Sequence, residues 1–158
     1  MRFSNIKSRS SSGFTLIELL ITVAIASILA SIALPLYSSH IVRANRSTAQ
    51  VQLMQAAQFM QRFYMANDSY SVDRAANLIA TQMPDGLQRS PSEGTALYTL
   101  TILELLNGAG FSLQMIPVAG GRMEEDECGT LTLNGTGARG VLIGGEAGNE
   151  SLMEMCWR

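Results

Sequence analysis

The chain has 158 residues, of which 47% are hydrophobic and 15% are charged, and its formal net charge at pH 7 is −2. This length is typical of one domain with an appended segment. The lack of a basic excess excludes broad electrostatic attraction to nucleic acid, because phosphate backbones are bound through an excess of Lys and Arg.

A long apolar run lies near the N-terminus. It extends over 24 residues from Phe14 to Tyr37 and contains one charged side chain, Glu18. At about 1.5 Å rise per residue, a helix of this length spans roughly 36 Å, which is enough to cross a bilayer. A carboxylate in such a segment costs about 2.5 to 3.5 kcal/mol on insertion scales. The sequence therefore predicts a membrane-spanning helix whose acid needs a positively charged partner.

The apolar run is preceded by a leader that contains basic and small residues and ends at Gly13. An ordinary secretory signal has its cleavage site after the apolar core, whereas Gly13 lies before it. Cleavage between Gly13 and Phe14 would leave the helix on the mature chain and create an α-amine four residues from Glu18. The amine of one molecule could then pair with the carboxylate of a neighbour. The alternative is a plain, uncleaved signal anchor.

The motif Gly13-Phe14-Thr15-Leu16-x-Glu18, with its basic leader and apolar helix, resembles the prepilin signal of type IV pilins and type II secretion pseudopilins. By this resemblance, a prepilin peptidase cleaves after Gly13 and N-methylates Phe14, and Glu18 is the assembly glutamate. Pro35 matches the proline of the family's helix and also removes one helical hydrogen bond. Ser27 stands where many members carry a glycine.

The leader also determines the expected topology. Removing residues 1–13 takes away three of the 11 basic side chains, which leaves 8 against 13 acidic ones and a formal charge of −5. Positive residues at the N-terminus hold that end in the cytoplasm. We expect three parts: a leader (1–13), a transmembrane and filament-core helix (14–37), and a periplasmic or extracellular globular domain (38–158).

Beyond Pro35 the pattern is that of an amphipathic helix. Apolar side chains recur at three- and four-residue intervals, with Thr48 among them: Ile41, Ala44, Thr48, Val51, Met54, Ala57, Phe59, Met60, Phe63 and Tyr64. The amides and arginines between them are expected to face solvent or other subunits: Arg43, Asn45, Arg46, Gln50, Gln52, Gln55, Gln58 and Arg62. The polar residues 67–69 end the helix. We therefore predict one continuous helix from Phe14 to about Ala66, whose second half packs into the globular domain.

The remaining residues carry turn and strand signals. Residues 67–95 are rich in turn formers and predict a long loop with one helical turn. Strands are expected at 96–103, 111–118 and 128–133, and residues 139–143 form either a fourth strand or an extended loop. The expected fold class is α+β: a long N-terminal helix packed on a small antiparallel sheet, as in pilins.

Two further details concern the strands. Gly108-Ala109-Gly110 predicts the turn of a hairpin between the first two strands. Pro117 lacks a backbone N–H, so its end of the second strand is expected at an edge or bulge.

The two cysteines, Cys128 and Cys156, suit an oxidising compartment. A disulfide between them would close a loop of about 29 residues, which the chain-entropy model values at ~3 to 4 kcal/mol. The alternative is two free buried thiols. The segment from Cys128 to Leu133, together with Cys156-Trp157, also resembles the C-terminal region of PilE-like minor pilins, in which two cysteines tie the tail to the sheet.

No metal, cofactor or catalytic site is expected. The acidic run Glu124–Glu127 lacks the spaced ligands and glycine of a calcium loop, so a solvated, self-repelling loop is the favoured interpretation. The single histidine, His40, has no Cys, Asp or Glu at metal-ligand spacing and is expected at the surface or an interface. No Ser-His-acid or Cys-His set is visible, so we expect no enzyme.

The leading hypothesis is a structural subunit, a minor pilin of a type IV pilus. Its expected partners are other major and minor pilins, the prepilin peptidase and the inner-membrane assembly platform. It would reside in the inner membrane before assembly and in the extracellular pilus afterwards. The alternatives are a type II secretion pseudopilin and a minor pilin that captures DNA for uptake. DNA binding is disfavoured because the arginines are scattered along the sequence. Roles in adhesion and twitching motility stay open.

Overall fold

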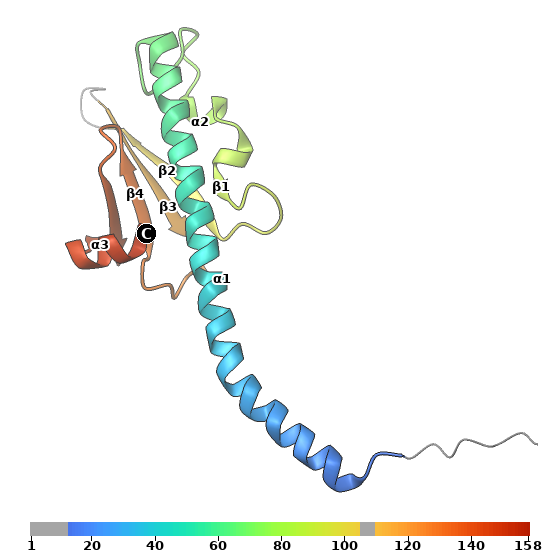
Figure 1. The fold of residues 1–158 in the computed structure, drawn as a ribbon. Helices are drawn as coiled ribbons and strands as arrows, with labels where there is room; N and C mark the ends of the chain where they lie inside the picture. The colour runs from blue at the N-terminus through green and yellow to red at the C-terminus, as the bar shows by residue number, and fades with distance from the viewer. Residues whose placement is uncertain (1–12, 105–109) are drawn as a thin grey trace, which may run out of the picture. The chain divides into compact units, whose positions relative to one another are not determined.

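The computed structural model describes residues 13–104 and 110–158 (Figure 1). It contains two compact units, residues Met1–Ser39 and His40–Arg158, which are described separately below. One helix, α1 (Leu16–Asn67), contributes residues to both units. The predicted helix from Phe14 to Ala66 is confirmed to within two residues at each end. Most of the predicted leader lies outside the described residues.

Local capping explains both ends of α1. At its start, the Thr15 hydroxyl accepts a hydrogen bond from the Glu18 backbone N–H at 3.3 Å, which satisfies one of the free N–H groups of the first turn. At its end, Asp68 adopts a left-handed conformation (φ 57°) and its N–H donates to the Tyr64 carbonyl at 2.7 Å. The Asn67 side chain also donates to the Phe63 carbonyl. The predicted stop at residues 67–69 is therefore confirmed.

The second unit contains a six-stranded antiparallel sheet with the order β1-β2-β3-β4-β5-β6. Its strands are β1 (Arg89–Ser90), β2 (Tyr98–Glu104), β3 (Phe111–Pro117), β4 (Thr130–Asn134), β5 (Arg139–Ile143) and β6 (Glu146–Ala147). Residues 139–143 thus form a strand, which settles the alternative left open by the sequence. The predicted hairpin is β2–β3, although Ala109 and Gly108 of its turn lie outside the described residues.

Two strand details follow from the register. β4 pairs with Ser112–Met115 of β3 and does not reach Pro117, so that end of β3 has an open edge, as predicted. Residues 67–95 contain more structure than the expected single turn: helix α2 (Ile79–Gln82), the 3-10 helix η1 (Asp85–Leu87) and strand β1. Ile79 and Met83 are buried, and this burial holds the segment against the core.

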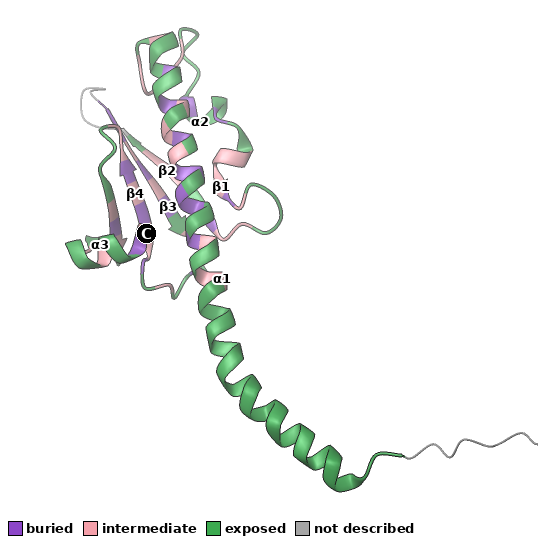
Figure 2. Ribbon diagram, viewed as in Figure 1, coloured by how far each residue is buried: buried purple, intermediate pink, exposed green. Residues whose placement is uncertain are grey.

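The core lies between the second half of α1 and one face of the sheet (Figure 2). Alternating burial along β3 and β4 places Leu113, Met115 and Leu131 inward. The predicted apolar stripe of α1 is only partly correct, because Ala44, Thr48 and Val51 are exposed. The buried positions of the helix are Arg46, Ala49, Gln50, Gln52, Leu53, Ala56, Met60 and Phe63. Six of these eight lie outside the predicted stripe: three are apolar, and three are polar residues that find partners elsewhere in the second unit.

Three aromatic rings pack against one another at the end of the core near the C-terminus of α1. The rings of Tyr64 and Tyr70 lie 4.4 Å apart, and Tyr70 contacts Phe111 edge-on at 5.1 Å between centroids. Stacked and edge-to-face rings add to the stability gained from burial alone. The stack therefore connects the end of α1 to the first residue of β3.

The described chain ends in a short helix, α3 (Glu150–Cys156), which the sequence analysis did not predict. The Asn149 side chain caps it by accepting from the Leu152 N–H at 2.9 Å. This cap followed by apolar residues at positions 152, 153 and 156 is a helix signal that the sequence contained.

Candidate functional sites

The first candidate site is the apolar half of α1. The large apolar side chains from Phe14 to Tyr37 are between 54% and 79% exposed. By length and composition, α1 is long and apolar enough to cross a membrane, and it is the one such helix among the residues described. Gly13 and Phe14 are both exposed just before the helix begins.

Glu18 lies in the first turn of this helix. Its backbone N–H is satisfied by Thr15, and the Thr15 hydroxyl lies 3.5 Å from a Glu18 carboxylate oxygen. This arrangement resembles a capping box, a role for Thr15 that the sequence analysis missed although the Thr-x-x-Glu spacing shows it. A hydroxyl does not neutralise a negative charge, so the carboxylate still needs a cationic partner in an apolar environment.

The polar side chains within the apolar half bond to their own helix. The hydroxyls of Thr22, Ser27, Ser31, Ser38 and Ser39 donate to carbonyls three or four residues earlier. Ser27, at the position where many pilins have glycine, donates to the Val23 carbonyl at 2.8 Å. Pro35 lies inside α1, which continues past it.

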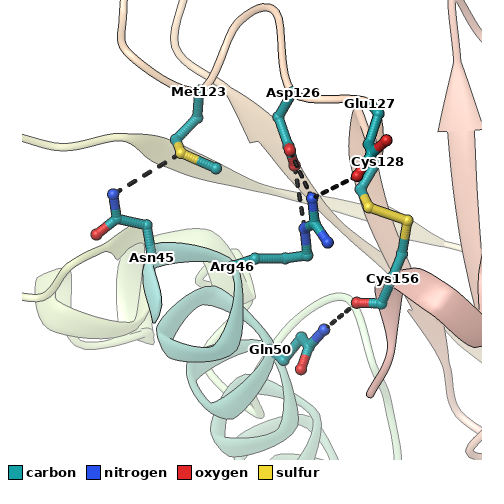
Figure 3. A network of polar contacts seen from close by, with 8 residues as sticks. All are labelled: Asn45, Arg46, Gln50, Met123, Asp126, Glu127, Cys128 and Cys156. Carbon is teal, nitrogen blue, oxygen red and sulfur yellow. Dashed lines mark hydrogen bonds and ion pairs between the residues drawn. A yellow bond between two sulfur atoms is a disulfide. The ribbon is translucent and has the colours of Figure 1, made fainter. Parts of the chain in front are cut away.

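The second candidate site is a group of buried polar contacts within the second unit (Figure 3). Arg46 donates two hydrogen bonds to Asp126, from Nη2 at 2.6 Å and from Nε at 3.2 Å. The two side chains are only 6% and 3% exposed. A Glu127 carboxylate oxygen lies 3.7 Å from the same Arg46 nitrogen, but its side chain is 65% exposed.

Burial and the neighbouring negative charge shift the pKa of Arg46 in opposite directions. Burial by itself lowers the pKa of Arg46, but the hydrogen bond and charge of Asp126 outweigh it and leave the pKa raised. Tyr98 is fully buried nearby, and burial, followed by the negative charge of Asp126, raises the pKa of its hydroxyl. The Arg46 guanidinium therefore stays charged at physiological pH.

Two expectations from the sequence are wrong here. Glu124, Glu125 and Glu127 are exposed as predicted, but Asp126 is buried against α1 rather than solvated. Arg46, expected at the surface, is buried because Asp126 meets it. The helix amides Gln50 and Gln52 are also buried, and they donate to the carbonyls of Cys156 and Gly86 respectively.

The two cysteines form a disulfide, with their Cα atoms 5.7 Å apart. Near each cysteine, a side chain of α1 makes a hydrogen bond to the chain. Asp126, two residues before Cys128, is held by Arg46, and the Cys156 carbonyl accepts from the Gln50 side chain (Figure 3). Arg46 and Gln50 are four residues apart and so lie on one face of the helix.

The third candidate site is an open hollow of about 410 Å³ lined by Arg139, Met153, Glu154, Trp157 and Arg158. The indole N–H of Trp157 donates to the Gly140 carbonyl at 2.9 Å. The guanidinium carbon of Arg139 lies 5.2 Å from the centroid of the Trp157 ring, within the range of a cation–π contact. The hollow thus combines two cations, one acid and a fixed aromatic ring.

The fold also bears on the metal hypothesis. Across residues 13–104 and 110–158, no group of three His, Cys, Asp or Glu side chains is placed to hold a metal ion. His40 is exposed. The sequence did not predict the Arg46–Asp126 pair or the hollow, because each needs a contact between distant positions: Arg46 with Asp126, and Arg139 with residues 153–158.

Comparison with known proteins identifies the family. A family model described as type IV minor pilin ComP, DNA uptake sequence receptor, matches residues 35–132, which is more than half of the chain. The chain belongs to this family of type IV minor pilins. A model of the prokaryotic N-terminal methylation motif matches residues 8–34 of the pilin. The predicted family, methylation motif and α+β fold are therefore confirmed.

Several curated proteins match parts of this pilin. It is 38% identical over 87 residues to the type IV wide pilus major component PilA4 of Thermus thermophilus, covering 55% of this chain and 63% of that protein. It is 41% identical over 71 residues to the type IV major pilin protein PilA of Myxococcus xanthus, covering 45% and 32%. It is 66% identical over 32 residues to the fimbrial protein EcpB of Eikenella corrodens, covering 20% of each. The matched stretches span less than two thirds of these relatives.

Among solved structures, a type IV pilin from Shewanella oneidensis aligns with a TM-score of 0.42 and 26% identity, covering 62% of this chain and 89% of that chain. The matched family is described as a type IV minor pilin, and the two longer-matching curated relatives are described as pilus or pilin components. The roles of Gly13, Phe14, Glu18 and Pro35 stay predictions.

Proposed function

We propose that this pilin is a minor subunit of a type IV pilus, assembled through residues 14–37 after its leader is removed. The observation that carries the proposal is the exposed apolar half of α1, which the N-terminal methylation motif overlaps. Contiguous apolar surface of this extent needs a cover. Lipid covers it before assembly, and the helices of neighbouring pilins cover it in the filament.

Processing would occur at the inner membrane. A prepilin peptidase cleaves between Gly13 and Phe14 and methylates the new N-terminus, and the assembly platform then transfers the subunit into the pilus. The basic leader keeps the N-terminus in the cytoplasm, so the second unit lies on the opposite side. The exposure of Gly13 and Phe14, ahead of the first helical turn, supports access by a peptidase.

Glu18 would pair with the N-terminal amine of a neighbouring pilin. Its carboxylate has a contact at 3.5 Å with the Thr15 hydroxyl, which supplies no positive charge. In a low-dielectric helix bundle, an amine within contact distance is strongly favoured over no partner. The pair would set the axial position of one subunit against the next.

The test is incorporation of Glu18→Ala into sheared pili, compared with wild type and with the matched apolar change Leu29→Ala. We expect Glu18→Ala to be exported and cleaved normally but depleted from filaments, whereas Leu29→Ala is incorporated. A Gly13→Val change should leave the precursor uncleaved on a gel. Normal incorporation of Glu18→Ala would overturn the pairing, and cleaved Gly13→Val would overturn the processing site.

DNA capture is a second candidate function, and two observations favour it. The matching family model is described as a DNA uptake sequence receptor. The fold also brings Arg139 and Arg158 to one hollow beside Trp157, although the sequence places them 19 positions apart. Arginines contact phosphate oxygens, and an adjacent aromatic ring adds a surface for a sugar or base. The net acidic chain would then bind through this local site alone.

DNA binding is tested by the anisotropy of a labelled duplex titrated with the full chain in detergent. In Arg139→Gln/Arg158→Gln we expect weaker binding and a salt dependence reduced by about two phosphate contacts. Arg122→Gln removes an exposed arginine that does not line the hollow and serves as the charge control. Equal loss in the control would show a nonspecific charge effect and count against the hollow.

A further inference from the structure

The hollow is built almost entirely from the last helix and the residues after it. Arg139 comes from β5, whereas Met153, Glu154, Trp157 and Arg158 belong to α3 or follow it. We call residues 149–158 the tail. The hollow therefore exists only while the tail lies against β5.

The tail is attached by partly buried side chains, the Arg139–Trp157 contact, hydrogen bonds and the disulfide. α3 has seven residues, and isolated helices of this length are unstable in water. Cys156 is its one buried residue, while Leu152, Met153 and Trp157 are half-buried. Besides the disulfide, the described contacts include single hydrogen bonds from Gln50 to Cys156 and from Trp157 to Gly140. Apart from the backbone that leads out of β6, the disulfide is the covalent link between the tail and the sheet.

The other end of the disulfide is anchored independently. Asp126, two residues before Cys128, is held by the two buried hydrogen bonds from Arg46. Gly129 packs so closely that a Cβ there would lie 2.5 Å from the Leu142 carbonyl oxygen. Breaking the disulfide therefore leaves Cys128 in place, and the tail is the part that is released.

We propose that the Cys128–Cys156 disulfide controls an anion-binding hollow for phosphate groups, present in the oxidised pilin and dispersed on reduction. A dithiol reductant transfers two electrons and two protons to the disulfide, yielding two cysteine thiols and its own cyclic disulfide. The released tail carries Trp157 and Arg158 away from Arg139. The identity of the ligand as DNA rests on the second candidate function above, but the redox control does not.

Trp157 provides a direct measurement, because it is the single tryptophan of the chain. Its fluorescence is measured in the full chain in detergent, oxidised and after dithiothreitol, with iodide as the anionic quencher and acrylamide as the neutral one. On reduction we expect acrylamide quenching to increase about twofold, because a locally unfolded tail is exposed. The ratio of iodide to acrylamide quenching should fall, because Arg139 no longer lies near the ring. Arg139→Gln should lower the same ratio without reduction, and Arg122→Gln should not.

Hydrogen exchange determines whether the release is local. Reduced wild type should lose amide protection in α3 while β2, β3 and β4 keep theirs, and Cys128→Ser/Cys156→Ser should behave alike. Unchanged Trp157 quenching on reduction would overturn the proposal, as would loss of protection throughout the sheet. If quenching responds as expected but the oxidised chain does not bind the labelled duplex, DNA capture fails and the redox control of the hollow stands.

Discussion

The two halves of α1 differ in whether the rest of the chain covers them. From Leu16 to Ser39 the helix is largely apolar, and every described residue is exposed. From His40 to Asn67 the same helix buries Arg46, Gln50 and Gln52. Polar side chains of α1 are therefore buried where other parts of the chain offer them hydrogen-bond or charged partners. The sheet, its loops and the C-terminal segment supply a carboxylate and carbonyls to the second half, whereas no described residue of the first half is covered by the rest of the chain.

The largest expected effect comes from breaking the buried pair on one side. Arg46→Met leaves Asp126 buried without a cation, which costs about 3 to 5 kcal/mol for pairs of this kind. Urea unfolding of the chain in detergent, followed by Trp157 fluorescence, measures this loss.

The matched control removes both charges. Arg46→Met/Asp126→Leu should recover most of the stability, because two apolar groups of similar size replace the pair without leaving a buried charge. If Arg46→Met and Arg46→Met/Asp126→Leu were equally unstable, the loss would come from packing and not from the unpaired charge of Asp126. If the single variant were as stable as wild type, the pair would have no structural role.

A second prediction compares two leucines of α1. Leu53 is 0% exposed and Leu29 is 63% exposed. Leu53→Ala should lower the free energy of unfolding of the second unit by about 2 to 5 kcal/mol, because it leaves a cavity in the core. Leu29→Ala should leave that unfolding unchanged in detergent. Equal effects from both changes, measured in the same urea titration, would contradict the separation of the two halves.

The sequence predicts the periodic parts of this fold better than its polar contacts. α1, β2, β3 and β4 have regular apolar patterns and were found close to their predicted bounds. The Arg46–Asp126 pair joins residues 80 positions apart, and no local pattern indicates that a charge will be buried. The hollow has the same origin, since Arg139 and Trp157 meet only after the tail has folded back.

The smallest expected effect concerns a buried hydroxyl. The Tyr98 hydroxyl has no hydrogen-bond partner in the part of the chain that the structure describes. Tyr98→Phe should therefore change the free energy of unfolding by less than about 1 kcal/mol at neutral pH, since it removes an unsatisfied group. By contrast, Arg46→Met leaves the charge of Asp126 buried without a cationic partner.

The same variant should differ from wild type in alkali. The folded-state pKa of Tyr98 is raised above its usual value near 10, so the folded state resists ionisation. Wild-type stability should fall as pH rises above about 10, where the unfolded state releases its proton first. Tyr98→Phe should lose less stability over that range. Parallel pH profiles for the two proteins would contradict the burial of this hydroxyl.

The self-bonded hydroxyls of the apolar half affect how neighbouring helices recognise it. Thr22, Ser27 and Ser31 already donate to carbonyls of their own helix, so they offer no donor to an adjacent chain. Seen from lipid or from another pilin, this part of α1 is nearly uniform around its axis. Under the proposed pairing, Glu18 and side-chain shape would set the azimuth of this helix in a filament, and a subunit would enter the growing fibre without first finding a particular rotational setting.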